Sequence, residues 1–286
     1  MSGRVVVIGA SGFVGRHIAD VARRNGPVLG LSTADIDLRA PSAGSALAKV
    51  LRSDDAVVMC SALTPEHGRD AATLIMNVTM GKEVADALAA CPPAYVIYVS
   101  SDGVYADIER VTEATPAEPQ NLYGLMHLTR ERIFLETAQR TKVPLLIMRP
   151  VALYGPGDTH GAYGPNRFAQ MALADGKIAL FGKGEERRDH LFIVDFARAL
   201  SLALHRRITG LLNVATGDAV TFGAVAQTVA RLAQRSVDVV ETPRAAGSVI
   251  THRSMDIAHL RATLPELSFT SLEAGLQATL AGAAQR

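Results

Sequence analysis

Short runs of apolar residues, rich in valine and isoleucine, recur through the first half of the chain. They are Val5–Ile8, Val28–Leu31, Ala56–Cys60, Tyr95–Val99 and Leu145–Met148. A continuous apolar run of this length is typical of a strand that is buried on both faces of a parallel sheet. Segments of helical character separate the runs, including residues 73–90 and 122–138. The alternation of strand and helix predicts an α/β fold with helices on both faces of the sheet.

The first apolar run leads directly into the glycine-rich sequence GASGFVG, residues 9–15. Glycine at positions 9, 12 and 15 permits a tight turn, close approach of a ligand to the backbone, and close packing of the next helix on the strand. We expect that helix to begin near Gly12, so that its free N–H groups and positive dipole end face a phosphate. The residues expected to bind a dinucleotide here are Gly9, Ser11, Gly12, Phe13, Val14 and Gly15. An ordinary strand-to-helix turn is the alternative.

The same pattern predicts how the chain divides. The strand–turn–helix start indicates a doubly wound, parallel-sheet Rossmann domain. From Tyr154 onward the alternation becomes irregular and turn-rich, with Tyr154–Asp158 and Tyr163–Asn166 as examples. We therefore expect residues 1–153 and 190–208 to form the Rossmann domain, and residues 154–189 and 209–286 to form a smaller C-terminal substrate-binding lobe.

The composition of the chain argues against some classes of function. The chain is 48% hydrophobic and 20% charged, with a net charge of +1. It therefore lacks the long-range field that binding to nucleic acid or to an anionic membrane requires. The N-terminal apolar run is only as long as a strand, so it predicts neither a signal peptide nor a membrane span, and we expect a cytoplasmic protein. Cys60 and Cys91 lack a metal-ligand pattern and are expected to be buried thiols; no metal is predicted.

The ends of the next strands carry the candidate cofactor contacts. An NAD-specific Rossmann unit places an acidic residue about twenty residues after the glycines, but Ser32 and Thr33 occupy that zone here, so the choice between NAD and NADP stays open. Asp37 and Leu38 are candidates for the adenine side, with a solvated loop as the alternative. Beyond the strand at residues 56–60, the carboxyl edge of the sheet predicts three further contacts: Ser61, Ala62 and Leu63.

Polar residues that suit proton transfer follow in the same domain. Ser101 and Asp102 come directly after the strand at residues 95–99, at the sheet edge where open α/β folds bind ligands. Tyr123 and His127 share one face of the predicted helix because of their i, i+4 spacing. Taken alone, each residue has an ordinary alternative, since a tyrosine on a helix is usually a packed aromatic.

With the glycine turn, Ser101 and Tyr123 in this order, the chain resembles the extended short-chain dehydrogenase/reductase superfamily. Within it, the chain is most similar to the NAD-dependent epimerase/dehydratase family of nucleotide-sugar epimerases, dehydratases and 4-ketosugar reductases. The resemblance covers about residues 3 to 280. The motifs that carry it are GASGFVG, YVSSDGVYAD, RPVALYGPGD, FGKGEERRDHLFIVDFARAL, LNVATGD and MDIAHLRATLPELSFTSLEAGL.

The resemblance implies catalytic roles. Tyr123 would move a proton to or from a sugar hydroxyl or carbonyl while hydride passes to or from a nicotinamide, and Ser101 would hydrogen-bond the same oxygen. Asn77 resembles the asparagine that completes the family's set. At position 127, however, histidine replaces the family's lysine.

This replacement changes the electrostatics at Tyr123. A fixed ammonium about 4 Å from a phenol lowers its pKa from ~10 by up to roughly three units when the effective dielectric constant is about 20. A neutral imidazole supplies much less field but can still hydrogen-bond the nicotinamide ribose. His127 could therefore be a working substitute, the cause of a slow or altered enzyme, or the mark of a pseudo-enzyme that keeps its cofactor. If His127 acts protonated, activity should favour lower pH.

The resemblance also implies substrate contacts. Arg188 matches the arginine that grips the nucleotide diphosphate, Asn166 resembles a diphosphate-contacting asparagine, and Arg253 is a further candidate cation. A solvated charged turn is the alternative for Arg188. Asp102 is retained next to Ser101, but Gly103 stands where the family's dehydratases carry a second acid, which argues against a 4,6-dehydratase. Epimerase and 4-ketosugar reductase stay open.

Two other function classes remain. One is a non-catalytic NAD(P)-binding regulatory protein, which the histidine at position 127 favours. The other is a dehydrogenase or reductase of a small, non-nucleotide carbonyl compound. By analogy with the family, whose members often pair through the helix that carries the tyrosine, we expect a homodimer.

Overall fold

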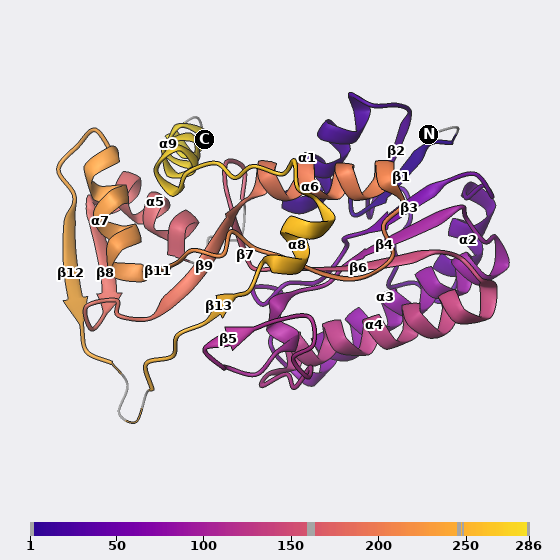
Figure 1. Ribbon diagram of the computed structural model, residues 1–286, viewed down its shortest axis with the longest axis horizontal. Coiled ribbons are helices and arrows are strands. Elements are labelled where there is room, and N and C mark those ends of the chain that lie inside the picture. The colour runs from indigo at the N-terminus through magenta and orange to yellow at the C-terminus, as the bar shows by residue number, and fades with distance from the viewer. Residues whose placement is uncertain (1–2, 159–163, 245–246, 248, 285–286) are drawn as a thin grey trace. The chain divides into compact units, whose positions relative to one another are not determined.

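The computed structural model describes residues 3–158, 164–244, 247 and 249–284. The chain divides into two compact units, which Figure 1 shows as ribbons. The first unit comprises Met1–Ala106, Glu113–Pro150 and Ala197–Asn213. The second comprises Asp107–Thr112, Val151–Phe196 and Val214–Arg286.

A six-stranded sheet organises the first unit, in the order β10-β6-β4-β3-β1-β2. The strands are β1 (Val5–Ile8), β2 (Val28–Leu31), β3 (Ala56–Met59), β4 (Tyr95–Val99), β6 (Leu145–Pro150) and β10 (Gly210–Val214). Each pairing from β2 to β6 is parallel. The chain runs from β1 to β2 on one side and then crosses to β3 on the other, so the strand order reverses between β1 and β3. In open α/β sheets this reversal marks the ligand crevice.

Helices cover both faces of this sheet. They are α1 (Phe13–Arg23), α2 (Ala43–Val50), α3 (Ala71–Ala90), the short 3₁₀ helix η1 (Asp102–Val104), α4 (Leu122–Thr141) and α6 (Ile193–Arg206). In Figure 1, α3 and α4 lie on one face, and α1 and the part of α6 that belongs to this unit lie on the other. The predicted doubly wound, parallel-sheet α/β fold is confirmed.

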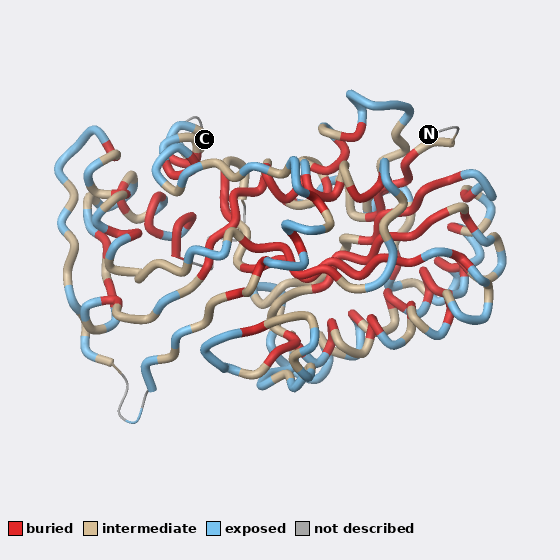
Figure 2. Tube along the Cα trace, viewed as in Figure 1, coloured by how far each residue is buried: buried red, intermediate tan, exposed pale blue. Residues whose placement is uncertain are grey.

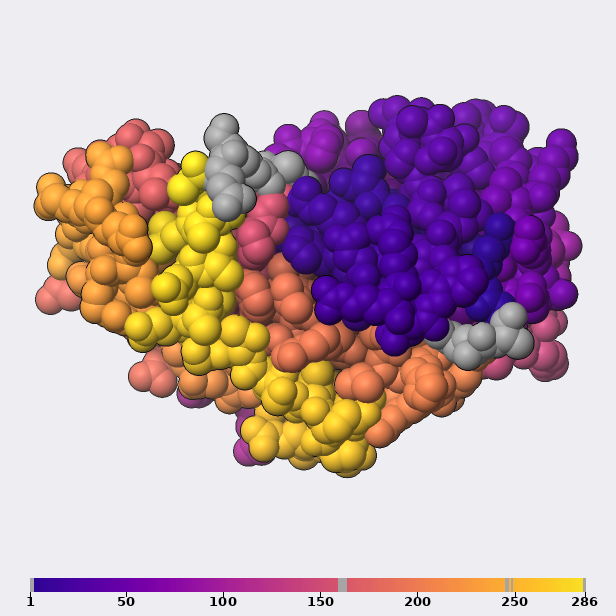
Figure 3. Space-filling model, turned by 90° about the horizontal axis from the view of Figure 1, so that it is seen from above, coloured from indigo at the N-terminus to yellow at the C-terminus, as the bar shows by residue number. Residues whose placement is uncertain are grey.

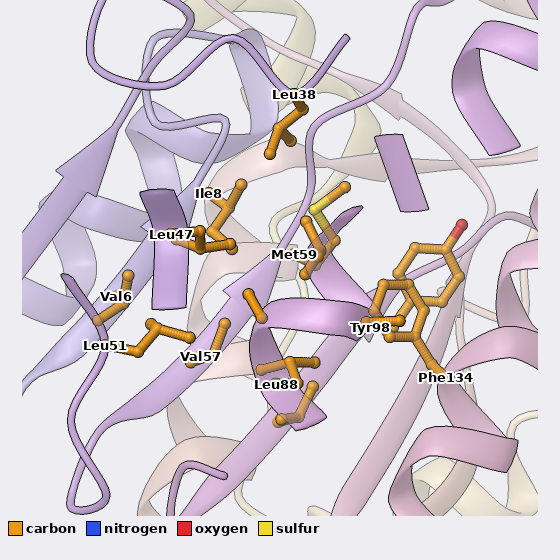
Figure 4. Close-up of a cluster of buried hydrophobic side chains, with 14 of the residues drawn as sticks. Val6, Ile8, Leu38, Leu47, Leu51, Val57, Met59, Leu88, Tyr98 and Phe134 are labelled. Atoms are coloured by element: carbon orange, nitrogen blue, oxygen red, sulfur yellow. The ribbon is translucent and has the colours of Figure 1, made fainter. Parts of the chain in front are cut away.

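An apolar cluster joins the sheet to α2, α3 and α4. Val57 and Met59 of β3 contact a layer that includes Leu47 of α2, Leu88 of α3 and Phe134 of α4 (Figure 4). These side chains are buried, and strands β1, β3, β4 and β6 are buried along their whole length, as Figure 2 shows. Each such side chain contributes about 1.5–3 kcal/mol on burial, so this layer holds the sheet edge and its loops in place.

The second unit is built from short strands and helices. Its strands are β5 (Arg110–Val111), β7 (Ala152–Tyr154), β8 (Lys177–Phe181), β9 (Arg187–Phe192), β11 (Ala219–Thr221), β12 (Asp238–Thr242) and β13 (Ser254–Met255). Its helices are α5 (Gly164–Asp175), α7 (Phe222–Leu232), α8 (Ala258–Thr263) and α9 (Leu272–Ala284), with the start of α6. β9 is central to a three-stranded sheet, between β7 and β11.

This unit has its own apolar core. Phe168 of α5, Val229 of α7 and Leu276 of α9 contribute buried side chains to it. The orange α7 and yellow α9 segments lie side by side in Figure 3. Among the residues that the structure describes, no helix combines the length and the apolar character that crossing a membrane requires.

Candidate active site

In the glycine turn, the packing of the protein leaves no room for a side chain at Gly9 or Gly15, but it does leave room for one at Gly12. Gly9 has φ +94°, and a Cβ there would lie 2.8 Å from the Ser61 backbone N. A Cβ at Gly15 would lie 2.0 Å from the Gly9 carbonyl O. At Gly12 a Cβ would meet that same oxygen at 3.4 Å, an ordinary contact, so the protein's own packing permits a side chain. Gly12 is also the N-cap of α1, and no side chain caps the helix there.

This arrangement fits a bound phosphate. An uncapped helix N-terminus presents free N–H groups and a positive dipole end, and the missing side chain at Gly12 lets an anion approach them. Ser11 is exposed, and Val14 is half-buried. The Phe13 ring is buried with its edge against His17, at a centroid distance of 5.4 Å, so only the Phe13 backbone is available to a ligand. The turn can hold a dinucleotide pyrophosphate.

In the segment after β2, the side chains of Asp37 and Leu38 lie in different environments. Asp37 is exposed and pairs with Arg39, with 2.7 Å between Oδ2 and Nη2, which lowers the pKa of Asp37 to about 2. The Leu38 side chain is instead buried in the apolar cluster of the first unit (Figure 4). Ser32 donates from its backbone N and its hydroxyl to Asp35, at 2.8 and 2.7 Å. The Leu38 side chain therefore packs in the protein interior, and Asp37 is the one of the two that faces solvent.

Asn77 holds the loop that follows β3. Its Oδ1 accepts from the Leu63 backbone N at 2.8 Å, and its Nδ2 donates to the Leu63 carbonyl O at 2.9 Å. Nδ2 also lies 3.2 Å from the Thr73 carbonyl O. Because both polar ends of this buried amide bind protein groups, Asn77 fixes the backbone of Leu63, one of the three residues expected beside a cofactor.

Ser101 and Tyr123 both lie close to Gly103. A Cβ placed on Gly103 would be 3.3 Å from the Ser101 Oγ and 3.8 Å from the Tyr123 ring. The Ser101 hydroxyl caps η1 by accepting from the Gly103 N at 3.0 Å, and it donates to Asp102 Oδ1 at 3.4 Å. A Cβ on Gly124 would lie 2.0 Å from the Gly103 carbonyl O, so η1 and the start of α4 pack backbone to backbone. This close packing brings the predicted serine and tyrosine together.

The Tyr123 phenol is hard to ionise in this environment. Burial, together with the nearby Asp102 carboxylate, raises the pKa of Tyr123 to about 12, while Arg130 acts in the opposite direction. The His127 ring stands edge-on to the Tyr123 ring at a centroid distance of 4.7 Å. Tyr123 is therefore a neutral phenol at ordinary pH, able to donate a proton.

His127 is a buried, neutral imidazole. Its Nδ1 lies 2.8 Å from the Tyr98 hydroxyl, and its Nε2 has no hydrogen-bond partner within the described part of the chain. Burial, with a contribution from the Arg130 charge, lowers the pKa of His127 to about 3. Near neutral pH the imidazole is uncharged, contrary to the hypothesis that a protonated His127 assists Tyr123. An unpaired buried nitrogen suits a hydroxyl ligand such as a ribose.

Sequence reasoning missed Arg130, which lies on the same helix face as Tyr123 and His127. Its side chain is fully buried. It donates to the Asn77 carbonyl O at 2.7 Å, to the Ser61 carbonyl O at 2.8 Å and to Asn77 Oδ1 at 3.2 Å. Gly81 makes room for it, because a Cβ there would lie 2.8 Å from the Arg130 Cγ. Its i, i+7 spacing from Tyr123 was the available signal, but an arginine at that spacing is ordinarily exposed.

A second missed cluster supports the end of β4. Glu131 accepts from the Ser100 hydroxyl at 2.5 Å and from Arg149, with 2.6 Å between Oε2 and Nη2. All three side chains are buried. The cluster fixes Ser100, and with it the backbone that leads into Ser101.

In the second unit, Asn166 fixes a loop. Its Oδ1 accepts from the Gly155 N at 3.1 Å, and its Nδ2 donates to Asp158 Oδ2 at 2.6 Å. Asn166 lines a pocket with Gly157, Thr279 and other residues of that unit. The amide's role toward the protein is thus to hold the turn from Gly155 to Asp158.

The structure brings Arg188 and Arg253 together. Arg253 Nη2 donates to Asp107 Oδ1 at 2.7 Å, and Arg188 Nη2 lies 3.7 Å from the same oxygen. Arg188 also donates to the carbonyl and hydroxyl oxygens of Thr251, at 2.8 and 2.6 Å. Two guanidinium groups therefore share one half-exposed carboxylate.

Known proteins with similar sequences belong to the family that the motifs indicate. A model of the NAD dependent epimerase/dehydratase family matches residues 5–215. ADP-L-glycero-D-manno-heptose-6-epimerase from Alkalilimnicola ehrlichii is 28% identical over 194 residues, which are 63% of this chain. The match spans only 61% of that relative's length.

Solved structures agree in fold. RMD from Pseudomonas aeruginosa, in complex with NADPH, superposes with a TM-score of 0.85 at 23% identity over 100% of both chains. UDP-glucose 4-epimerase from Thermus thermophilus, in complex with NAD, gives 0.85 at 20% identity over 98% of this chain and 99% of the other. The expected nicotinamide dinucleotide agrees with the NAD dependence of the matched family, and the resemblance seen in the motifs is confirmed. The chain belongs to the NAD-dependent epimerase/dehydratase family.

Proposed function

We propose that this protein is an NAD(P)-dependent enzyme that transfers hydride at a hexose carbon of a nucleotide sugar, with Tyr123 as the acid/base. The observation that supports this most strongly is the packing of η1 on α4, where the Ser101 hydroxyl and the Tyr123 ring both lie close to Gly103. The glycine turn belongs to the same unit. Family membership supports the same reaction class.

The proposed cofactor contacts follow from the fit described above. The N–H groups of residues 12–15 bind the pyrophosphate, with Gly12 allowing close approach. The unpaired His127 Nε2 binds a ribose hydroxyl, while Tyr98 holds the opposite ring nitrogen. The bound nicotinamide supplies the hydride acceptor or donor.

The proposed chemistry uses two side chains. The Ser101 hydroxyl donates a hydrogen bond to the reacting sugar oxygen. In the oxidation direction the ionised Tyr123 would accept the proton of that hydroxyl while the hydride of the adjacent C–H bond passes to the nicotinamide, and the neutral phenol would return the proton in the reverse direction. Because the pKa of Tyr123 is raised to about 12, proton abstraction needs a positive charge that stabilises the phenolate.

The proposed substrate contacts are Arg188 and Arg253. A diphosphate would take the place of the Asp107 carboxylate between the two guanidinium groups. The heptose epimerase relative supports the substrate class, because its name specifies an ADP-sugar. Asp102 followed by Gly103 disfavours a 4,6-dehydratase and leaves epimerase and 4-ketosugar reductase.

Calorimetry with a panel of nucleotide sugars, in the presence of saturating NAD or NADP, tests the proposal. We expect at least one of them to bind, and Arg188→Ala to weaken that binding about tenfold or more. Turnover should disappear in Tyr123→Phe while dinucleotide binding persists. Failure of every nucleoside diphosphate to bind the parent protein would favour a small carbonyl substrate instead.

A second candidate is a non-catalytic NAD(P)-binding protein. The neutral His127 and the raised pKa of Tyr123 favour it, because neither supplies a ready base. A protein that binds dinucleotide but shows no hydride transfer with any sugar nucleotide would support this candidate.

We also propose that the protein forms a homodimer through α3 and α4. Ile75 and Met76 of α3 and Leu122 and Leu125 of α4 are exposed apolar side chains on these two neighbouring helices. Light scattering should give twice the chain mass, and Leu125→Glu should reduce it to that of one chain.

A further inference from the structure

Arg130 is a fully buried cation that interacts with the neutral Tyr98 phenol and donates to three uncharged oxygens. They are the carbonyl oxygens of Asn77 and Ser61 and the amide oxygen of Asn77. Within the described part of the chain, Arg130 forms no ion pair. A buried charge without a carboxylate partner costs folding free energy. Because perturbed, buried charges cluster at functional sites, the electric field of Arg130 is a candidate for a functional role.

The positive charge of Arg130 acts on Tyr123, the proposed acid/base. Tyr123, His127 and Arg130 follow i, i+4 and i+7 spacing on α4, which puts them on one helix face. The rings of Tyr123 and His127 are 4.7 Å apart, and His127 Nδ1 binds the Tyr98 hydroxyl at 2.8 Å. The Arg130 charge acts on all three of these rings, and it lowers the pKa of Tyr123.

The other charged groups around α4 do not supply a positive field. From η1, the Asp102 carboxylate raises the pKa of Tyr123. From β6, Arg149 is neutralised by Glu131 of α4. From α3, Lys82 pairs with Asp86 at 2.6 Å and lies 3.7 Å from Glu83, a carboxylate that also accepts from the Gly44 N. Tyr98 of β4 is a neutral phenol whose pKa burial raises.

We propose that Arg130 is the permanent cation of this active site and that it compensates for the lysine absent from position 127 by stabilising the phenolate of Tyr123. The proposal rests on the function proposed above. It divides the lysine's two tasks between two residues: His127 Nε2 binds a hydroxyl, and Arg130 supplies the charge. A guanidinium suits the second task because it stays protonated even when buried. Arg130 acts through Tyr123 and is a positioning residue, not a catalytic one.

The competing explanation is a purely structural arginine. Its bonds to Ser61 and Asn77 join α4 to α3 and to the loop after β3, and this role needs hydrogen bonds but not charge. The two explanations separate when the charge is changed and the hydrogen bonds are partly kept. Arg130→Gln retains N–H donors without charge, and Arg130→Lys retains charge with different donors.

The test measures the phenol pKa of the residue at position 123 in cofactor-free protein. A fluorinated tyrosine incorporated there lowers the phenol pKa into an accessible range and reports it by fluorine NMR. We expect Arg130→Gln to raise this pKa by about one, a tenfold loss of phenolate at fixed pH, and Arg130→Lys to leave it near the parent value. The matched control is Arg132→Met, which removes an exposed cation from the same helix and should leave the pKa unchanged.

A phenol pKa that is the same in the parent and in Arg130→Gln overturns the proposal. So does a pKa that rises in Arg130→Lys, and this second result decides the matter even if the glutamine variant fails to fold. Hydride transfer by the parent is measured in parallel. A pKa rise in Arg130→Gln without turnover by the parent would support the charge assignment and refute the proposed function.

Discussion

Two buried arginines in the first unit show different ways to accommodate a charge. Arg149 meets the Glu131 carboxylate, with two hydrogen bonds of 2.8 and 2.6 Å. Arg130, which directly precedes Glu131 on α4, donates to carbonyl and amide oxygens and interacts with the neutral Tyr98 phenol. Burial opposes the charge of both. At Arg149 the Glu131 carboxylate, together with Tyr105, more than offsets burial and raises the pKa, whereas at Arg130 burial prevails and lowers it.

The two arginines therefore have different roles: Arg149 stabilises the structure, whereas Arg130 changes the electrostatic potential at the site. An ion pair largely cancels its own field, so Arg149 and Glu131 stabilise the end of β4 without charging the site. A guanidinium on neutral acceptors keeps its field, and Tyr123 and His127 both respond to it. Substitution of one residue at a time separates these two roles.

The largest effect is expected at the ion pair. Glu131→Gln leaves the Arg149 charge buried and uncompensated, so the free energy of unfolding should fall by about 3–5 kcal/mol. Urea denaturation measures this loss. Glu136→Gln breaks an exposed contact with Arg140 on the same helix and should leave the stability unchanged. Equal stability of the two variants would contradict the importance of the buried pair.

Removal of Arg130 should cost less than removal of Glu131. Arg130→Met loses three hydrogen bonds, but it also removes the buried charge itself, so we expect the free energy of unfolding to fall by about 2 kcal/mol. The same urea experiments give the comparison. A loss larger than that of Glu131→Gln would mean that Arg130 is the main structural element of the two.

The contrast between these residues also shows what the sequence could reveal. The strands and the glycine turn were predictable because their signals are local, an apolar run or a fixed spacing, and a motif likewise led to the prediction of Ser101 and Tyr123 as site residues. Burial of Arg130 depends on space that Gly81 provides from another helix, and no local pattern reports that. The convergence of Arg188 and Arg253 on Asp107 likewise depends on tertiary structure. Leu38 was a cofactor candidate by position, but its apolar side chain packs in the core.

Acid should destabilise the protein through His127. The pKa of His127 is about 3 in the folded protein and about 6.5 when unfolded, so below pH 6.5 the unfolded state binds the extra proton. Stability is therefore fully present above about pH 6.5 and is lost as the pH falls toward about 3. At about pH 5.5 the loss should be about 1.4 kcal/mol.

The comparison with His127→Gln isolates this effect, because both proteins share all other titrating groups. The stability difference between them should change across this pH window. A difference that does not depend on pH would mean that His127 titrates normally. In Arg130→Met the acid effect should be smaller, because the positive neighbour that disfavours the imidazolium is gone.

The smallest effect is expected at Tyr98. Tyr98→Phe removes the hydroxyl that binds His127 Nδ1, and the free energy of unfolding should fall by about 1 kcal/mol. Dinucleotide affinity should also fall several-fold, because the imidazole loses its fixed orientation. Tyr95→Phe is the matched control on the same strand: its hydroxyl donates to the Ile208 carbonyl O, so stability should fall similarly without a change in affinity. Equal affinities in the two variants would contradict the role of Tyr98.

The most direct test of the central claim is single-turnover reduction of bound NAD or oxidation of bound NADPH by nucleotide sugars and their keto forms. The absorbance of reduced nicotinamide is followed in the parent and in Tyr123→Phe. We expect at least one nucleotide sugar to change it in the parent, and Tyr123→Phe to bind the dinucleotide equally well but to react at least about 100-fold more slowly. Equal rates in the two proteins, or a parent protein that binds no dinucleotide, would contradict the assignment of Tyr123 as the acid/base.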